Sequence, residues 1–104
     1  MISTQLLDSA QGRPAARVPV DLDLFITGRG WHQVGHGLTN SEGRVDSFGA
    51  PAAAGVYRIV FDLAAYLPDA FFPSVAITFE VRDPEDHYHL PLVFSPFGYS
   101  VYRA

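Results

Sequence analysis

Histidine and arginine side chains are the residues of this sequence best suited to acid–base chemistry or ion binding. Two histidine pairs are present, His32 with His36 and His87 with His89. Because both pairs have even spacing, we expect both members of each pair to project from one face of a strand. Two such histidines can ligate a metal ion together, or they can be ordinary, partly exposed polar residues. No acidic residue has a spacing that completes a recognisable ligand set, and we therefore favour the second interpretation.

Arg44 is the second candidate for chemistry. It follows Asn40-Ser-Glu-Gly43, a tight-turn signal, and is expected at the start of a strand. The planar donor fork of a guanidinium suits a carboxylate or a urea-like group, although an ordinary surface arginine fits the same pattern. Signatures of other enzyme classes are missing, because the chain has no cysteine, no Gly-x-Ser-x-Gly elbow and no phosphate-binding loop.

Composition narrows the class of protein further. The 104 residues fit a single domain, 1–104, and 48% of them are hydrophobic. The net charge is −4 and all seven basic residues are arginines without a basic cluster, which argues against nucleic acid and against an anionic membrane surface. No signal peptide and no apolar run of about 20 residues is visible. We therefore expect a cytoplasmic protein.

The elements that position these side chains are predicted to be strands, because the dominant hydrophobic period is two. Eight prolines and nine glycines predict many turns, including one at 49–51, and few helices. The one helix expected runs from Asp62 to Leu67, where Pro68 stops it. Seven or eight short strands indicate an all-β sandwich or barrel. The predicted strands lie at 18–25, 31–37, 56–62, 75–82, 87–94 and 99–103, with a further short one at the N-terminus.

The alternation also predicts which side chains face the core. In 18–25, apolar residues at even positions oppose Asp21 and Asp23, so a slip of one residue would bury both carboxylates. In 56–62, Tyr57, Ile59 and Phe61 are expected to face inward.

Four motifs give the chain a resemblance to a known family. The run from His87 to Arg103, HYHLPLVFSPFGYSVYR, resembles the C-terminal signature of the transthyretin-like 5-hydroxyisourate hydrolases. Leu7–Ala16 (LDSAQGRPAA), Thr39–Arg44 (TNSEGR) and Phe71–Pro73 (FFP) are similar to further motifs of that family. They occur in the family's order and spacing, and the resemblance covers essentially the whole chain.

The resemblance implies a fold, an assembly and a reaction. The implied fold is a Greek-key sandwich of two sheets, about eight strands, with one short helix. The implied assembly is a homotetramer, a dimer of dimers, with sites in a channel between the dimers. The implied reaction is the hydrolytic opening of the cyclic amide of 5-hydroxyisourate, the product of urate oxidation, without metal or cofactor.

The resemblance also implies which residues form the site. The family's arginine after Asp-Gly corresponds to Arg44, and the second histidine of its His-Tyr-His corresponds to His89. The terminal tyrosine and arginine correspond to Tyr102 and Arg103, expected to bind substrate. An N-terminal family histidine corresponds to Gln5, and Ala104 stands where the family continues with Gly-Ser.

Gln5 determines how far the family's activity carries over. Its amide can orient a water or a substrate amide through one acceptor and two donors, but it does not titrate. His89 titrates near neutral pH and is predicted to be the base, and Arg44 to hold the carbonyl oxygen as negative charge develops. Three hypotheses follow: a urate-pathway hydrolase, an enzyme recruited to a different small molecule, and a non-catalytic small-molecule binder. Gln5 can also be a strand residue without a role.

Overall fold

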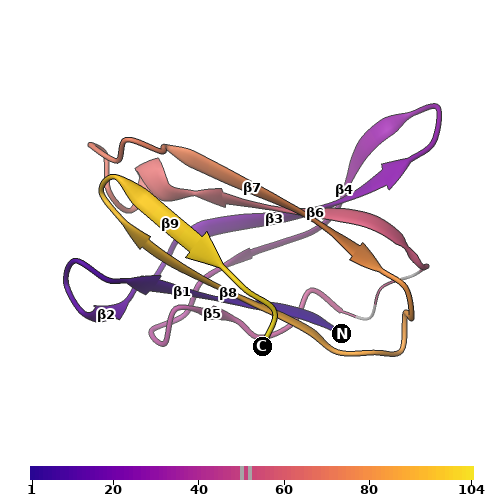
Figure 1. Ribbon diagram of the computed structural model, residues 1–104, viewed down its shortest axis with the longest axis horizontal. Helices are drawn as coiled ribbons and strands as arrows, with labels where there is room; N and C mark the ends of the chain where they lie inside the picture. Colours follow the sequence, from indigo (N-terminus) through magenta and orange to yellow (C-terminus); the bar gives the residue numbers. More distant parts are fainter. Residues whose placement is uncertain (50, 52) are drawn as a thin grey trace.

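The predicted strands form two sheets packed face to face in the computed structural model, which describes residues 1–49, 51 and 53–104 (Figure 1). The predicted turn at 49–51 includes Ala50, which lies outside the described residues. The elements are β1 (Ile2–Asp8), β2 (Arg13–Pro14), β3 (Pro19–Ile26), β4 (Gly30–Leu38), β5 (Arg44–Val45), β6 (Gly55–Asp62), a 3₁₀ turn η1 (Leu63–Ala65), β7 (Ser74–Val81), β8 (Tyr88–Ser95) and β9 (Gly98–Val101).

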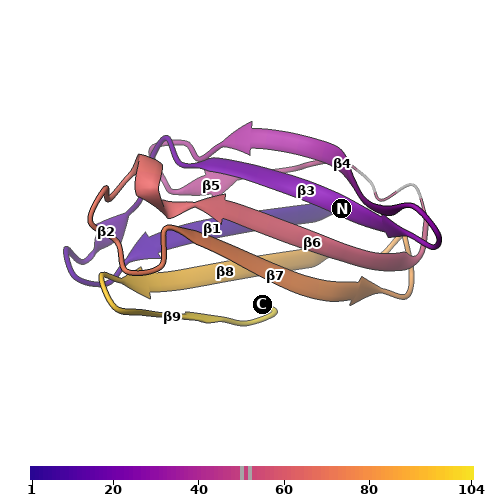
Figure 2. The ribbon, with the colours of Figure 1, turned by 90° about the horizontal axis from the view of Figure 1, so that it is seen from above.

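Two separate sheets show that the fold is a sandwich and not a barrel. One sheet has the order β2-β1-β8-β9, with β5 also paired to β1, and the other has the order β4-β3-β6-β7 (Figure 2). The β1–β8 pair is parallel and the remaining pairs are antiparallel. The β3–β4 hairpin extends beyond the rest of the sandwich in Figure 1. The predicted all-β, two-sheet architecture is confirmed.

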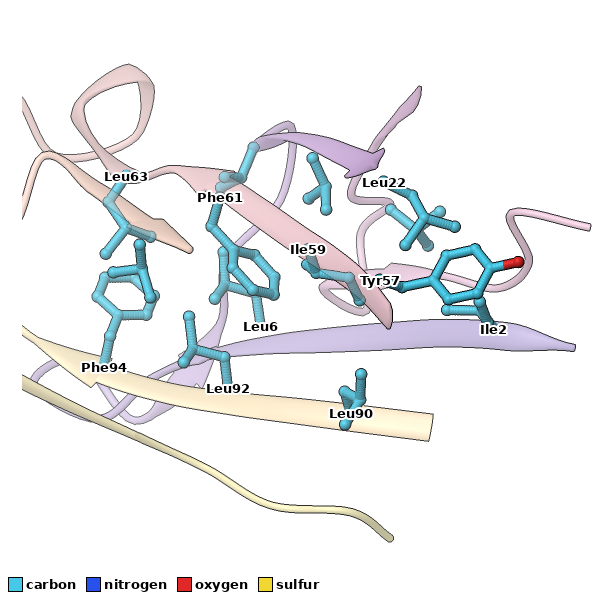
Figure 3. Packing of buried hydrophobic residues seen from close by; sticks show 14 of the residues in the cluster. Ile2, Leu6, Leu22, Tyr57, Ile59, Phe61, Leu63, Leu90, Leu92 and Phe94 are labelled. Carbon is cyan, nitrogen blue, oxygen red and sulfur yellow. The ribbon is translucent and has the colours of Figure 1, made fainter. Parts of the chain in front are cut away.

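The core lies between the sheets and is built by the period-two pattern. Tyr57, Ile59 and Phe61 of β6 are at most 1% exposed, as predicted. Figure 3 shows them on one side of the core and Leu90 and Leu92 of β8 on the other. Each such side chain stabilises the fold by about 1.5–3 kcal/mol when fully buried. The remaining large, fully buried side chains are Ile2, Leu6, Val18, Val20, Leu63, Val75, Val81 and Phe94.

The predicted outward face of β3 is not fully solvated. Asp23 projects away from the core, yet it is only 8% exposed, because Arg58 covers it. Arg58 donates through Nε (3.1 Å) and a terminal nitrogen (2.8 Å) to one carboxylate oxygen of Asp23. Its guanidinium also lies 4.4 Å from the centre of the Trp31 ring. A paired and partly covered carboxylate therefore lies where the pattern predicts an exposed one.

The prediction that His32 and His36 share one face is wrong. The β3–β4 register shifts between Leu22 and Asp23, so that Leu22 pairs with Gly35 but Asp23 pairs with Gln33. Val34 is the extra residue of this β-bulge, and an inserted residue reverses the alternation beyond it. His36 therefore lies with Asp21, to which Nδ1 is hydrogen-bonded at 2.5 Å, on the opposite face from His32, which pairs with Leu24.

The predicted helix at Asp62–Leu67 is present in shortened form. Asp62 is the last residue of β6, and only Leu63–Ala65 form a 3₁₀ turn. The Asp62 carboxylate caps this turn by accepting a hydrogen bond from the Ala65 amide. β6 continues through Asp62 because Asp62 pairs with Ser74 of β7, which leaves too few residues before Pro68 for a second turn.

Asp8 connects β1 to two other parts of the fold and is only 4% exposed. One carboxylate oxygen accepts from the amides of Ala10 and Gln11, which closes the turn after β1. The other accepts from the Tyr66 hydroxyl at 2.9 Å, which fixes the segment after η1. Burial, reinforced by this hydrogen bond to Asp8, raises the pKa of Tyr66. Both links depend on one carboxylate.

We expect Asp8→Ala to lower the free energy of unfolding by about 1–3 kcal/mol, because it removes the acceptor of three partly buried hydrogen bonds. Urea denaturation of the variant beside wild type measures this. The matched control is Asp69→Ala, since Asp69 is exposed and surface substitutions usually change stability by about 0.5 kcal/mol or less. Equal losses in the two variants would contradict this account of Asp8.

Candidate functional site

Strand register brings the candidate residues of distant motifs onto one sheet face. In the parallel β1–β8 pair, Ser3 lies beside His89 and Gln5 beside Pro91. In the antiparallel β1–β5 pair, Gln5 lies beside Arg44. Side chains directly opposite each other share a face, and here it is the face turned away from the core. We call Ser3, Gln5, Arg44 and His89 the outer-face group.

The turn before Arg44 is held by hydrogen bonds within itself. The Asn40 side-chain oxygen accepts from the amides of Glu42 (2.9 Å) and Arg44 (3.0 Å). Gly43 has φ +75°, and a Cβ there would lie 2.4 Å from the Leu6 carbonyl oxygen of β1. Only glycine allows this approach, so Gly43 is needed to seat β5 against β1 and to place Arg44 beside Gln5.

Thr39 ties this turn to the rest of the sandwich and is only 2% exposed. Its hydroxyl donates to the Ala15 carbonyl at 2.7 Å and accepts from the Val18 amide at 2.9 Å. In the motif Thr39–Arg44, Thr39 thus anchors the segment to the sandwich, and the closed turn that follows positions the Arg44 guanidinium.

Gln5 is held by the same turn. Its side-chain nitrogen donates to the Glu42 carbonyl at 3.1 Å. This bond fixes the amide and leaves its oxygen available as an acceptor on the outer face. Gln5 therefore orients one acceptor next to Arg44 but supplies no group that titrates.

His89 is the residue of the outer-face group that can titrate near neutral pH, and a hydrogen bond to Ser3 holds its ring. Its Nδ1 lies 2.8 Å from the Ser3 hydroxyl oxygen, and Nε2 has no hydrogen-bond partner among the described residues. Burial lowers the pKa of His89 below its ordinary value of 6.5, and the nearby charges of Arg44 and His87 lower it further. At neutral pH the ring is therefore uncharged and able to accept a proton.

Tyr102 and Arg103 lie on opposite faces of their sheet. After β9 the chain continues beside β8, with hydrogen bonds from Tyr102 N to Pro91 O (3.3 Å) and from Ala104 N to His89 O (3.0 Å). This pairing places Tyr102 and Ala104 on the face of His89 and turns Arg103 to the other face. The structure thus brings Tyr102 to the side of the outer-face group but not Arg103.

Arg103 instead fastens the end of this segment. Its guanidinium donates to the His87 carbonyl at 2.9 Å and to Asp86 at 3.4 Å, and it lies 4.5 Å from the centre of the Tyr88 ring. The pKa of Asp86 is lowered by the His87 amide first and by Arg103 second. Its contacts hold the chain in place alongside His89.

Ser3 is the member of the group that sequence reasoning missed. Its spacing of two from Gln5 was a signal, because residues two apart on a strand share a face. The parallel register that brings Ser3 to His89 connects residues 86 positions apart and has no local signature.

The members of the outer-face group differ in exposure: Ser3 is buried, whereas Gln5, Arg44 and His89 are half-buried. Two cavities lie elsewhere in the described part of the chain, and this group lines neither of them. One is apolar, about 100 Å³, and is lined by residues that include Leu24 and Phe48. The other is a polar hollow of about 380 Å³ beside Arg82 and Arg103.

Two further features are absent from residues 1–49, 51 and 53–104. No group of three or more His, Cys, Asp or Glu side chains is arranged to hold a metal ion there. The same residues include no helix of the length and apolarity required to cross a bilayer.

Comparison with known proteins identifies the family. Residues 2–104 match the HIUase/Transthyretin family, and the chain belongs to it. It is 42% identical over 114 residues to 5-hydroxyisourate hydrolase 2 of Rhizobium meliloti, covering 99% of this chain and 94% of that protein. It is 39% identical over 122 residues to the uric acid degradation bifunctional protein TTL of Arabidopsis thaliana, covering 99% of this chain but only 36% of that protein.

A solved structure shows the same fold in a protein with a bound ligand. Sea bream transthyretin in complex with thyroxine superposes with a TM-score of 0.91 at 30% identity, covering 99% of this chain and 93% of that one. The fold alone is therefore compatible with both hydrolase and ligand-binding relatives, and the outer-face group has to discriminate between them.

We expect NMR titration of His89 to give a pKa below 6.5, and Arg44→Gln to raise it. Removing the neighbouring cation makes protonation of the ring less unfavourable, whereas burial still opposes it. The control is Arg29→Gln, an exposed arginine of the β3–β4 hairpin, which should leave the pKa unchanged. A wild-type pKa at or above 6.5, or one insensitive to Arg44→Gln, would refute the assigned causes.

Proposed function

We propose that this chain is a cofactor-independent hydrolase of urate degradation that opens the cyclic amide of 5-hydroxyisourate, with residues 1–104 acting as a single domain. The observation that carries the proposal is the convergence of Arg44, His89 and Gln5 on one sheet face. Family membership and 42% identity to a bacterial 5-hydroxyisourate hydrolase support it.

The chemistry follows from what each side chain can do. A water adds to a ring carbonyl carbon while the uncharged His89 takes one of its protons. Arg44 stabilises the negative charge that develops on the carbonyl oxygen. The ring C–N bond then breaks, and the departing nitrogen takes a proton back from His89. The oxygen of Gln5 orients the water or a ring N–H, and Tyr102 contacts the substrate from the same face.

Arg103 acts at a distance in this proposal. Its contacts with Asp86 and His87 hold the segment that carries Tyr102, and so it shapes the substrate site without touching the reacting atoms. This assigns Arg103 a positioning role.

Specific observations favour each of two other functions. Gln5 cannot titrate, which favours an enzyme recruited to a different cyclic or planar small molecule. The close match to sea bream transthyretin, a structure containing thyroxine, favours a non-catalytic small-molecule binder. Retention of both Arg44 and His89 on one face supports catalysis over binding alone.

The proposal includes a homotetramer in the cytoplasm, a dimer of dimers with the sites between dimers. The partial exposure of Gln5, Arg44 and His89 supports assembly, because a second copy would exclude water from them. A patch of exposed aromatic side chains supports it too, with Phe71 67% and Phe97 80% exposed. Phe71 contacts both Phe72 and Phe97, so these rings form one continuous surface.

The proposed cytoplasmic location is supported by the absence of cysteine from the sequence. The fold needs no disulfide, which suits a reducing compartment.

We expect wild type to accelerate the decay of 5-hydroxyisourate freshly generated by urate oxidase, and His89→Ala to lose about 10²–10⁴-fold of that acceleration. The control is His32→Ala, an exposed histidine on the other sheet. Gln5→His, assayed alongside, should be at least as active as wild type.

Each other outcome points to one of the alternatives. Acceleration by Gln5→His alone would mean that the scaffold is intact but the natural substrate differs. Saturable ligand binding without turnover by wild type would indicate a binder. Equal rates for wild type and His89→Ala would remove the proposed mechanism.

For the assembly, we expect light scattering after size-exclusion chromatography to give four times the subunit mass. Phe97→Arg places a charge in the exposed aromatic patch and should reduce the mass, whereas Val34→Arg, at an exposed position of β4, should not. A wild-type mass equal to that of one subunit would contradict the proposed tetramer.

A further inference from the structure

Ser3 has a contact that the mechanism above does not use. It is only 7% exposed although it lies on the outer face of its sheet. Its hydroxyl oxygen lies 2.8 Å from Nδ1 of His89. The two residues are direct neighbours in the parallel β1–β8 register, so a short side chain spans the gap between adjacent strands.

The direction of this hydrogen bond determines what His89 can do. A neutral imidazole carries its proton on one nitrogen and a lone pair on the other. If Nδ1–H donates to Ser3, the lone pair is on Nε2, the nitrogen left free on the outer face. If Ser3 donates instead, Nε2 carries the proton and cannot accept one from water.

The charge of Arg44 selects between the two arrangements. Arg44, from β5, is close enough to contribute to the electrostatics of the ring, and His87 contributes as well. A cation on the outer face favours a lone pair there and disfavours an N–H dipole pointing outward. With Nδ1 occupied by Ser3, the lone pair is thus favoured on Nε2.

We infer that Ser3 is a positioning residue of this site, whose hydroxyl oxygen accepts a hydrogen bond from Nδ1–H of His89 and so presents the Nε2 lone pair beside Arg44 and Gln5. The inference rests on the proposed function, because it gives the proposed base its orientation and tautomer. The same arrangement, a base oriented by a third group, is the general logic of activated nucleophiles.

The proton balance of the proposed reaction is kept. Nε2 takes a proton from water as the new C–O bond forms, and Nδ1–H stays bonded to Ser3. The resulting imidazolium returns the Nε2 proton to the nitrogen that leaves when the C–N bond breaks. Ser3 accepts throughout and neither gains nor loses a proton.

The first test is independent of activity. Long-range ¹H–¹⁵N correlation NMR on the full chain, above the pKa of His89, reports which ring nitrogen is protonated. We expect Nδ1–H in wild type and in Ser3→Thr, and a shift toward Nε2–H, the usual tautomer in water, in Ser3→Ala. Nε2–H in wild type would overturn the inference, whatever the enzyme activity.

The second test uses kinetics with 5-hydroxyisourate. Ser3→Ala should lower kcat by about 10–100-fold, the usual effect of removing a group that orients a functional side chain, with KM nearly unchanged. Ser3→Thr keeps the hydroxyl and should restore most of kcat. Ser100→Ala, which removes an exposed hydroxyl from β9 of the same sheet, is the control. Full activity in Ser3→Ala would overturn the positioning role.

The two tests separate this inference from the proposed function. If no variant opens 5-hydroxyisourate, the proposed function fails, while the NMR tautomer still decides for or against Ser3. If Ser3→Ala does not fold, the wild-type tautomer and the activity of Ser3→Thr decide instead.

Discussion

The parallel register of β1 on β8 is the constraint on which the site depends. It places Ser3 beside His89 and Gln5 beside Pro91, although Ser3 and His89 are 86 positions apart in the sequence. The core enforces this register, because Ile2 and Leu6 of β1 are fully buried. A slip of one residue would expose both, at a cost of about 1.5–3 kcal/mol each, and would turn Ser3 and Gln5 of β1 inward. Packing between the sheets thus determines the geometry on their outside.

The turn at Thr39–Arg44 is the second feature that determines the geometry of the site. It explains why a motif that resembles the family's contains residues that cannot take part in catalysis themselves. Thr39 is an anchor, Asn40 closes the turn, and Gly43 allows the approach to β1. Each of them acts through backbone groups, and together they place one guanidinium. The recognisable part of the motif is mostly a scaffold for Arg44.

Much of the fold could be predicted from the sequence, because alternation is a local signal that burial enforces: every strand predicted from it is present. What failed depended on distant partners. The bulge at Val34, which separates His32 from His36, exists only in the pairing of β4 with β3. The covering of Asp23 required Arg58 of another strand. Motif resemblance named Arg44, His89 and Tyr102, which share a face, but only pairing with β8 reveals that Arg103 turns away from them.

Gln5 changes the chemistry of this site more than its geometry. A neutral histidine at that position has one hydrogen-bond donor and one acceptor. The Gln5 amide offers the same pair, because its nitrogen donates to the Glu42 carbonyl and its oxygen is an acceptor on the outer face. Either side chain can therefore hold the turn and orient a water. They differ only when a proton must be stored, because the amide does not titrate. In the proposed mechanism, proton transfer then depends on His89 alone. Burial and Arg44 lower the pKa of this ring, and the Ser3 hydroxyl lies against its Nδ1. A site with one base needs that base uncharged and correctly oriented, and burial, Arg44 and Ser3 together meet both conditions.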